Sequence, residues 1–109
     1  MRLSYVMKFV ADMDKAVAFY RDVLGMTLRF ASPDWSEFET GQTTLALHRA
    51  SDTHPAGSCQ IGFSVEDIDA FFQEKGAAGV VFTRPPTMEH GVKLADFVDS
   101  EGAEVSVSG

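Results

Sequence analysis

The sequence lacks the features that mark disulfide-bonded, membrane-spanning and secreted proteins, and it lacks several common catalytic motifs. It has one cysteine in 109 residues, which excludes an internal disulfide and suits a reducing compartment. No apolar run approaches the roughly 20 residues needed to cross a bilayer, and no signal-peptide core follows Met1. Glycine-rich phosphate loops, CxxC pairs and a Ser–His–Asp order are also absent. These absences predict a cytoplasmic globular protein.

Positive charge is scarce as well. Nine Lys and Arg residues stand against 16 Asp and Glu residues, so the net charge is −7. A surface of this sign repels phosphate backbones and anionic lipids, which argues against nucleic acid and membranes as partners. The same charge either favours cationic ligands or simply keeps the protein in solution.

What the sequence does contain is a repeat with a period of about half the chain. Residues 10–14 (VADMD) reappear as residues 65–69 (VEDID), so that Asp12 and Asp67 are 55 residues apart. Each copy follows an apolar strand-like run and precedes a helix-like one, and aspartate is a favoured helix N-cap. Halves this small bury too little surface to fold alone. We expect one domain over residues 1–109, with modules at residues 1–54 and 55–109.

Each half has the pattern of one strand, one helix and three further strands. In the first half, strands are expected at residues 3–10, 26–31, 35–40 and 43–49, and Gly25 is expected to end the helix. In the second half, strands are expected at residues 59–65, 80–83, 92–98 and 103–108, with Gly76 ending the helix and Pro85-Pro86 as a break. The prediction is an α+β fold of two tandem βαβββ modules, forming a curved mixed sheet around a cavity.

Two segments resemble a known family. Residues 10–25 (VADMDKAVAFYRDVLG) are similar to the "D…A..FY.dvLG" stretch of the vicinal oxygen chelate superfamily, and residues 97–105 (FVDSEGAEV) are similar to its "f.DPdG..iel" ending. This superfamily includes glyoxalase I, methylmalonyl-CoA epimerase, ring-cleaving dioxygenases and bleomycin-binding proteins. With the repeat, the resemblance covers essentially the whole chain. It implies the glyoxalase/bleomycin-resistance fold and a homodimer, swapped or unswapped.

The resemblance also implies a catalytic metal, held by side chains at four strand positions. Such an ion takes imidazole nitrogens and carboxylate oxygens as ligands. Here the four positions carry Tyr5, Gln60, Ser106 and, depending on the strand register, Ala46 or His48. Glu104 is displaced from Ser106 by about 6.6 Å along the strand, too far to replace it. We therefore expect no cofactor; a weak divalent metal site is the alternative.

Polar and aromatic side chains of the strands are the candidates for ligand contacts. Tyr5 and Gln60 occupy equivalent places in the two halves, and they bind either a ligand or each other and water. Trp35 and Phe38 either form a wall for a planar or cationic ligand or pack in the core. The complete set of candidate ligand-binding residues is Tyr5, Met7, Trp35, Phe38, His48, Gln60, His90 and Ser106.

Histidine supplies the only catalytic candidate. His48 is suited to proton transfer, although it alternates with Leu45 and Leu47 and is more simply explained as the polar side of a half-exposed strand. His90 lies in residues 85–91, a segment irregular enough to act as a flap over the cavity. His54 is expected to be a solvated linker residue. Cys59 begins a buried strand with no base beside it, which argues against a nucleophile.

The sequence is compatible with two main functions. The first is a metal-free protein that binds a small organic ligand, cationic or aromatic, in its cavity, as drug-sequestering members of the resembled family do. The second is an enzyme of the lyase, isomerase or dioxygenase kind, which either retains a weak metal site or transfers protons through His48 and Tyr5. A scaffold with a vestigial cavity is the third possibility.

Overall fold

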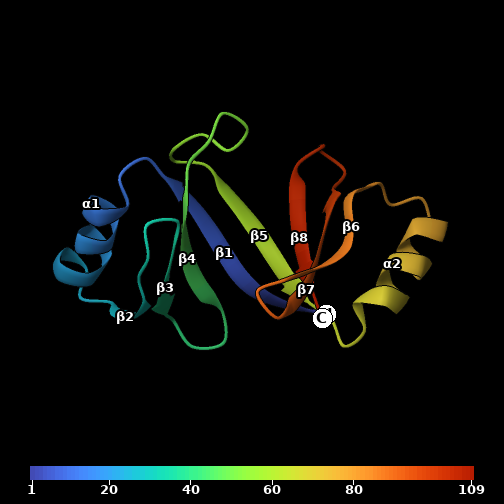
Figure 1. The fold of residues 1–109 in the computed structure, drawn as a ribbon, viewed down its shortest axis with the longest axis horizontal. Coiled ribbons are helices and arrows are strands. Elements are labelled where there is room, and N and C mark those ends of the chain that lie inside the picture. The colour runs from blue at the N-terminus through green and yellow to red at the C-terminus, as the bar shows by residue number, and fades with distance from the viewer. The chain divides into compact units, whose positions relative to one another are not determined.

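A computed structural model describes residues 1–109 as eight strands and two α-helices in two compact units (Figure 1). One unit comprises residues 4–60, and the other comprises residues 1–3 with residues 61–109. Strand, helix and three strands follow one another twice along the chain. The predicted α+β fold of two βαβββ modules is confirmed. None of the helices is long and apolar enough to span a membrane.

The first module is a four-stranded sheet with one helix against it. Its strands follow the order β2-β3-β4-β1, with β1 and β4 parallel and the other neighbours antiparallel. Val17 of the helix packs on Phe38 and Leu47 of the sheet to form the core. The elements are β1 (Arg2–Val10), α1 (Met13–Ala18), a π-helical turn η1 (Phe19–Val23), β2 (Thr27–Phe30), β3 (Trp35–Glu39) and β4 (Thr44–Arg49).

The second module repeats this arrangement. Its strands follow the order β5-β8-β7-β6, with β5 and β8 parallel and the other neighbours antiparallel. Ile68 of the helix packs on Ala95 and Val107. The elements are β5 (Cys59–Ser64), α2 (Ile68–Ala77), β6 (Phe82–Glu89), β7 (Val92–Val98) and β8 (Glu104–Ser108).

Both helices begin where the repeat predicts. The Asp12 carboxylate accepts from the Lys15 N–H at 3.1 Å, and the Asp67 carboxylate accepts from the Ala70 N–H at 3.1 Å. Each aspartate thereby satisfies a donor that the first helical turn leaves without a partner. At the other end of the first helix, Gly25 has the predicted left-handed conformation, with φ of +72°.

The prediction for the end of the second helix is wrong. Gly76 lies inside α2, which continues to Ala77 with Ala78 as its C-cap. The left-handed residue is Gly79, with φ of +101°. Alanine is the strongest helix former, so the two alanines after Gly76 extend the helix to the next glycine.

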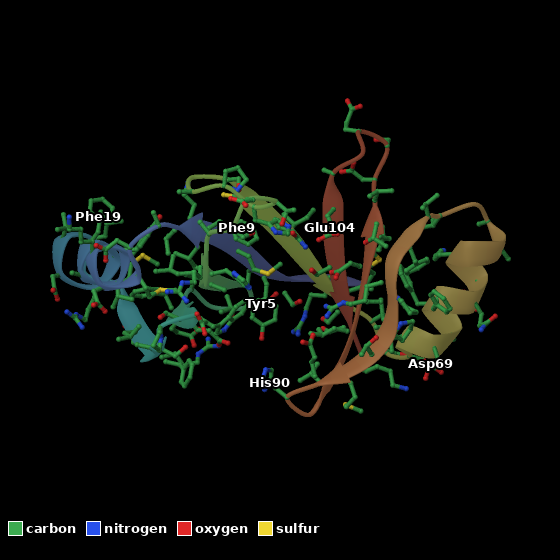
Figure 2. The ribbon with its side chains drawn as sticks, turned by 45° about the horizontal axis from the view of Figure 1, so that its top comes forward. Tyr5, Phe9, Phe19, Asp69, His90 and Glu104 are labelled. Atoms are coloured by element: carbon green, nitrogen blue, oxygen red, sulfur yellow. The ribbon has the colours of Figure 1, made fainter.

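The predicted break and flap at residues 85–91 are also wrong. Pro85 and Pro86 lie within β6, which pairs with β7 through a shifted register and is the last strand in the order of its module. An edge strand tolerates proline because one side of it has no ladder to complete. His90 and Gly91 form the two-residue turn at the tip of the β6–β7 hairpin, with φ of 50° and 80° (Figure 2). Such a turn is a regular hairpin connection rather than a mobile flap.

Candidate ligand-binding site

Strand alternation in the first module separates a core face from a second face turned away from α1. Leu45, Leu47 and Phe38 point toward the helix. The residues between them on β4 and β3 therefore point the other way, together with the odd-numbered residues of β1, which pair with them in register. This second face carries Tyr5, Met7, Phe9, Trp35, Glu37, Thr44, Ala46 and His48.

Aromatic rings form a continuous row on this second face. Ring centroids are 6.0 Å apart between Tyr5 and Trp35, 5.7 Å between Trp35 and His48, and 5.2 Å between His48 and Phe9. The Tyr5–Trp35 and Trp35–His48 pairs meet at 63° and 86°. We call Tyr5, Phe9, Trp35 and His48 the aromatic cluster; Figure 2 shows Tyr5 and Phe9 on their strand.

A loop adds a further ring to one end of this row. His54 stacks on Phe9, with centroids 4.5 Å apart and an interplanar angle of 19°. Lys8 donates to the Gly57 carbonyl at 3.0 Å, and the Gly57 N–H donates to the Phe9 carbonyl at 2.9 Å. The prediction that His54 is a solvated linker residue is therefore wrong, because these contacts hold the loop against β1.

A shielded carboxylate lies beside the aromatic cluster. The Trp35 indole Nε1 donates to Glu37 Oε2 at 2.7 Å, and Arg29 Nη1 donates to Glu37 Oε1 at 3.2 Å. The Glu37 side chain is only 19% exposed. Arg29 also donates to Glu39 and to the Thr44 hydroxyl, and its hydrogen bond holds the pKa of Glu39 below the ordinary value. Arg29 therefore fixes both carboxylates from one position on β2.

The chemistry of two cluster members follows from their surroundings. Burial raises the pKa of the Tyr5 phenol above its ordinary value, the Glu37 carboxylate raises it further, and Arg29 opposes the rise. Tyr5 is therefore a neutral hydrogen-bonding group at neutral pH. His48 Nδ1 lies 2.8 Å from the Arg49 carbonyl, which can only accept, so Nδ1 carries a hydrogen. In the neutral ring, Nε2 is then the acceptor.

The second module has a similar charge clamp on the face turned away from α2. Arg84 Nε lies 2.9 Å from Asp96 Oδ2, Arg84 also pairs with Glu89, and Ser106 donates to Asp96 Oδ1 at 2.8 Å. The Asp96 side chain is 13% exposed. Arg84 follows Arg29 by 55 residues, the same offset that relates the two capping aspartates. The repeat therefore includes an arginine that clamps carboxylates in each module.

The strand register identifies the four positions at which the family resemblance places a metal. Ala46 pairs with Met7, two residues after Tyr5, and Ser106 pairs with Gly62, two residues after Gln60. Ala46, and not His48, is thus the counterpart of Ser106. Ala46 has no donor atom, the Tyr5 phenol is protonated, and the Ser106 hydroxyl is bonded to Asp96. These residues do not fit a divalent metal, and no group of three His, Cys, Asp or Glu side chains is arranged to hold one.

The structure brings together only part of the predicted site. Tyr5, Met7, Trp35 and His48 share one face. Phe38 does not, because it is fully buried beneath α1 and belongs to the core. His90 is exposed at the hairpin tip and Ser106 belongs to the clamp of the other module, while Gln60 lies half-buried on β5. Cys59 is exposed, contrary to the buried position expected.

Sequence reasoning missed Arg29, Glu37 and Phe9 as members of the site. Two patterns could have indicated them. Phe9 alternates with Tyr5 and Met7 on one strand face, and Glu37 alternates with Trp35. Arg29 and Arg84 are related by the same 55-residue offset as the capping aspartates.

A cavity of about 650 Å³ lies elsewhere in the first module, on the side of the helix. Its walls come from the start of α1, the loop after β2 and the end of β4, and they include Asp14, Arg21, Pro33 and Arg49. None of the predicted site residues lines it. The two arginines already pair with the exposed carboxylates of Asp22 and Asp34.

Solved structures with the same fold include enzymes. The chain superposes with a TM-score of 0.82 and 18% identity on a variant of the methylmalonyl-CoA epimerase of Streptomyces coelicolor in complex with 2-nitronate-propionyl-CoA, covering 99% of this chain and 96% of that one. A protein described as an NAD-dependent benzaldehyde dehydrogenase from Legionella pneumophila gives a TM-score of 0.78 at 18% identity, with 95% and 96% covered. These likenesses establish the fold alone. No curated protein matches the sequence significantly.

The family is established by the sequence as a whole. The family model described as Glyoxalase/Bleomycin resistance protein/Dioxygenase superfamily matches residues 2–107. This range includes both capping aspartates, both clamps and the aromatic cluster. The chain belongs to the Glyoxalase/Bleomycin resistance protein/Dioxygenase superfamily.

Proposed function

We propose that this protein binds a small organic ligand on the aromatic cluster without the help of a metal ion. The observation that carries the proposal is the continuous row of rings on one sheet face, with the shielded Glu37 carboxylate beside it. Ligand sites combine apolar and aromatic walls with a few fixed polar groups, and this face has that composition. Met7 and Ala46 are the apolar residues between the rings on this face, and both are buried.

The side chains at the implied metal positions are poor ligands for a metal ion. An alanine and a protonated phenol stand where the family resemblance implies ligands in the first module. A ligand that meets no Lewis acid is held by ring contacts and hydrogen bonds alone, as in a protein that sequesters its ligand unchanged.

The test uses the single tryptophan, Trp35, as the probe. Small aromatic compounds, neutral and cationic, are titrated into protein purified without a histidine tag, before and after treatment with EDTA. We expect saturable quenching that EDTA does not change, and metal analysis is expected to give well below one equivalent of Ni, Zn, Fe or Mn per chain. Failure of every compound to bind, or binding that needs one equivalent of a divalent ion, would contradict the proposal.

A second candidate function rests on His48. Its Nδ1–H bonds the Arg49 carbonyl, so the neutral ring presents Nε2 as a base at the surface of the aromatic cluster. A lyase or isomerase that works by proton transfer would use this atom. His48→Ala separates the two functions, because it abolishes turnover in an enzyme, whereas in a binding protein it removes one ring contact and weakens the binding of the ligand without abolishing it. The homodimer implied by the family resemblance stays a prediction.

A further inference from the structure

We propose that the ligand of the aromatic cluster is an organic cation, whose substituted ammonium group lies against the rings of Trp35 and Tyr5 and is balanced by Glu37. This inference rests on the proposed function and names its ligand class. It is carried by three observations: the angles between the rings, the use of the indole N–H, and the sign of the nearby charges.

The rings beside Trp35 meet it at steep angles. Trp35 meets Tyr5 at 63° and His48 at 86°, so each pair joins an edge to a face and does not stack two faces together. The face of an aromatic ring carries negative potential and attracts a cation within about 6 Å of the ring centre. Quaternary ammonium groups are recognised by two or three aromatic faces around them, and the neighbouring rings of Tyr5 and Trp35 are the two that we assign to this contact.

The indole N–H of Trp35 is already engaged. It donates to Glu37 Oε2 at 2.7 Å, so the indole N–H is not free for an acceptor on the ligand. What Trp35 offers a ligand is its ring. At Trp35, this favours recognition of the ligand through a π face over recognition of its carbonyl or carboxylate oxygens.

The charge beside the rings is negative. Arg29, Glu37 and Glu39 form one connected group with two carboxylates and a single guanidinium. Arg29 donates from Nη1 to Glu37 and Thr44, and from Nη2 to Glu39. An anionic ligand would therefore meet an excess negative charge, whereas a cation would complete the balance. The net charge of −7 of the whole chain acts in the same direction.

Arg29 has a positioning role in this arrangement. It holds Glu37 Oε1 while the indole holds Oε2, so the carboxylate is fixed next to the ring that the ammonium group would contact. A pre-positioned charge loses little entropy when the ligand binds.

The experiment compares choline with 3,3-dimethyl-1-butanol (neopentyl carbinol), in which a carbon atom replaces the charged nitrogen of choline. Both are titrated into the wild-type protein at constant ionic strength, with Trp35 fluorescence and calorimetry as readouts. We expect choline to bind at least about tenfold more tightly than the carbinol, since the two differ only in charge.

Glu37→Gln removes the balancing charge while preserving size, and it should weaken choline at least about tenfold and the carbinol less than about twofold. The control is Glu101→Gln, the same change of charge in an exposed turn of the other module, for which both affinities should stay within about twofold. If Glu37→Gln does not fold, the comparison of choline with the carbinol on the wild-type protein still decides the question.

Two results would overturn the inference. One is equal or tighter binding of the neutral carbinol, and the other is no response to choline in a protein whose Trp35 responds to neutral aromatic compounds. In both cases the proposed function survives on the binding of those neutral compounds. Silence toward every compound, neutral or cationic, would instead refute the proposed function itself.

Discussion

Tyr5 combines a half-buried ring in the aromatic cluster with a phenol whose pKa is raised, chiefly by burial and further by Glu37. The protonated form is therefore favoured in the folded protein. Because the folded pKa lies above the unfolded one, the protonated phenol of Tyr5 contributes to the free energy of unfolding. This contribution is complete below about pH 10, the ordinary pKa of tyrosine. It is lost as the pH rises through the raised value.

The titration of Tyr5 can be measured alone, because the chain has only two tyrosines. In a Tyr20→Phe variant, we expect the absorbance of Tyr5 phenolate to develop above about pH 10 and to return to that ordinary range on unfolding. Adding Glu37→Gln should lower the midpoint, since that carboxylate contributes to the raised pKa. A midpoint unaffected by Glu37→Gln would show that the carboxylate is not close enough to act.

Single residues show why the site could be predicted only in part. Trp35 and Phe38 are three apart on one strand, and an odd spacing puts them on opposite faces, so only Trp35 belongs to the aromatic cluster. Alternation was sufficient to exclude Phe38. The stacking of His54 on Phe9 could not be predicted, because it depends on how a loop folds back over β1.

Elements were predictable where the sequence carries a local stop or start. The capping aspartates mark both helix starts, since an N-cap acts through hydrogen bonds to its own next turn. The length of β6 was not predictable from Pro85-Pro86, because proline ends a central strand but is tolerated on an edge. The position of the strand in the sheet, and not its composition, decides whether proline ends it.

The turn at the tip of the β6–β7 hairpin gives a test of the element itself. Both His90 and Gly91 have positive φ, and a turn of this type prefers Asn-Gly. Gly91→Ala should destabilise the protein by about 1 kcal/mol, although the added methyl group meets nothing within 4 Å. His90→Asn should leave stability unchanged or raise it by up to about 0.5 kcal/mol.

Urea unfolding of the two variants measures both effects. Gly102→Ala provides a matched control, because that glycine also has positive φ and open space around it, with φ of +77°. A cost at position 102 together with none at position 91 would mean that the tip of this hairpin is free to change its conformation.

At the scale of the whole molecule, the repeat joins modules that share little sequence. It preserves an aspartate that starts each helix and an arginine that clamps carboxylates on the face away from the helix. The aromatic rings belong to the first module alone, and the second has Ser106, Asp96 and Arg84 on the corresponding face. The sequence predicts the shared parts because they recur, whereas the pairing of Ala46 with Met7 requires the strand register.

The clamp of the second module makes a prediction about stability. Arg84→Met leaves the Asp96 carboxylate, 13% exposed, without its cation, and should cost about 1 to 2 kcal/mol, less than for a fully buried pair because the Arg84 side chain is 35% exposed. Arg21→Met is the control, since Arg21 and Asp22 are 48% and 60% exposed and such a surface pair should contribute little to stability.

Denaturant unfolding of both methionine variants, at the same pH and salt, measures this difference. Equal losses for the two would mean that the clamp is no more than a surface ion pair. Arg84→Met with Asp96→Asn should recover part of the loss, because the second change removes the isolated charge.

In each module, the first strand pairs with the last: Tyr5 lies beside Thr44, and Gly62 lies beside Ser106. Neither sheet can close until its final strand has left the ribosome, and the closing contact joins distant parts of the chain. Chains that depend on such non-local pairing fold slowly compared with helical bundles of the same size. The antiparallel hairpins, among them β3–β4 and β6–β7, are the segments able to form early, so we expect the two parallel pairings, β1 with β4 and β5 with β8, to form last.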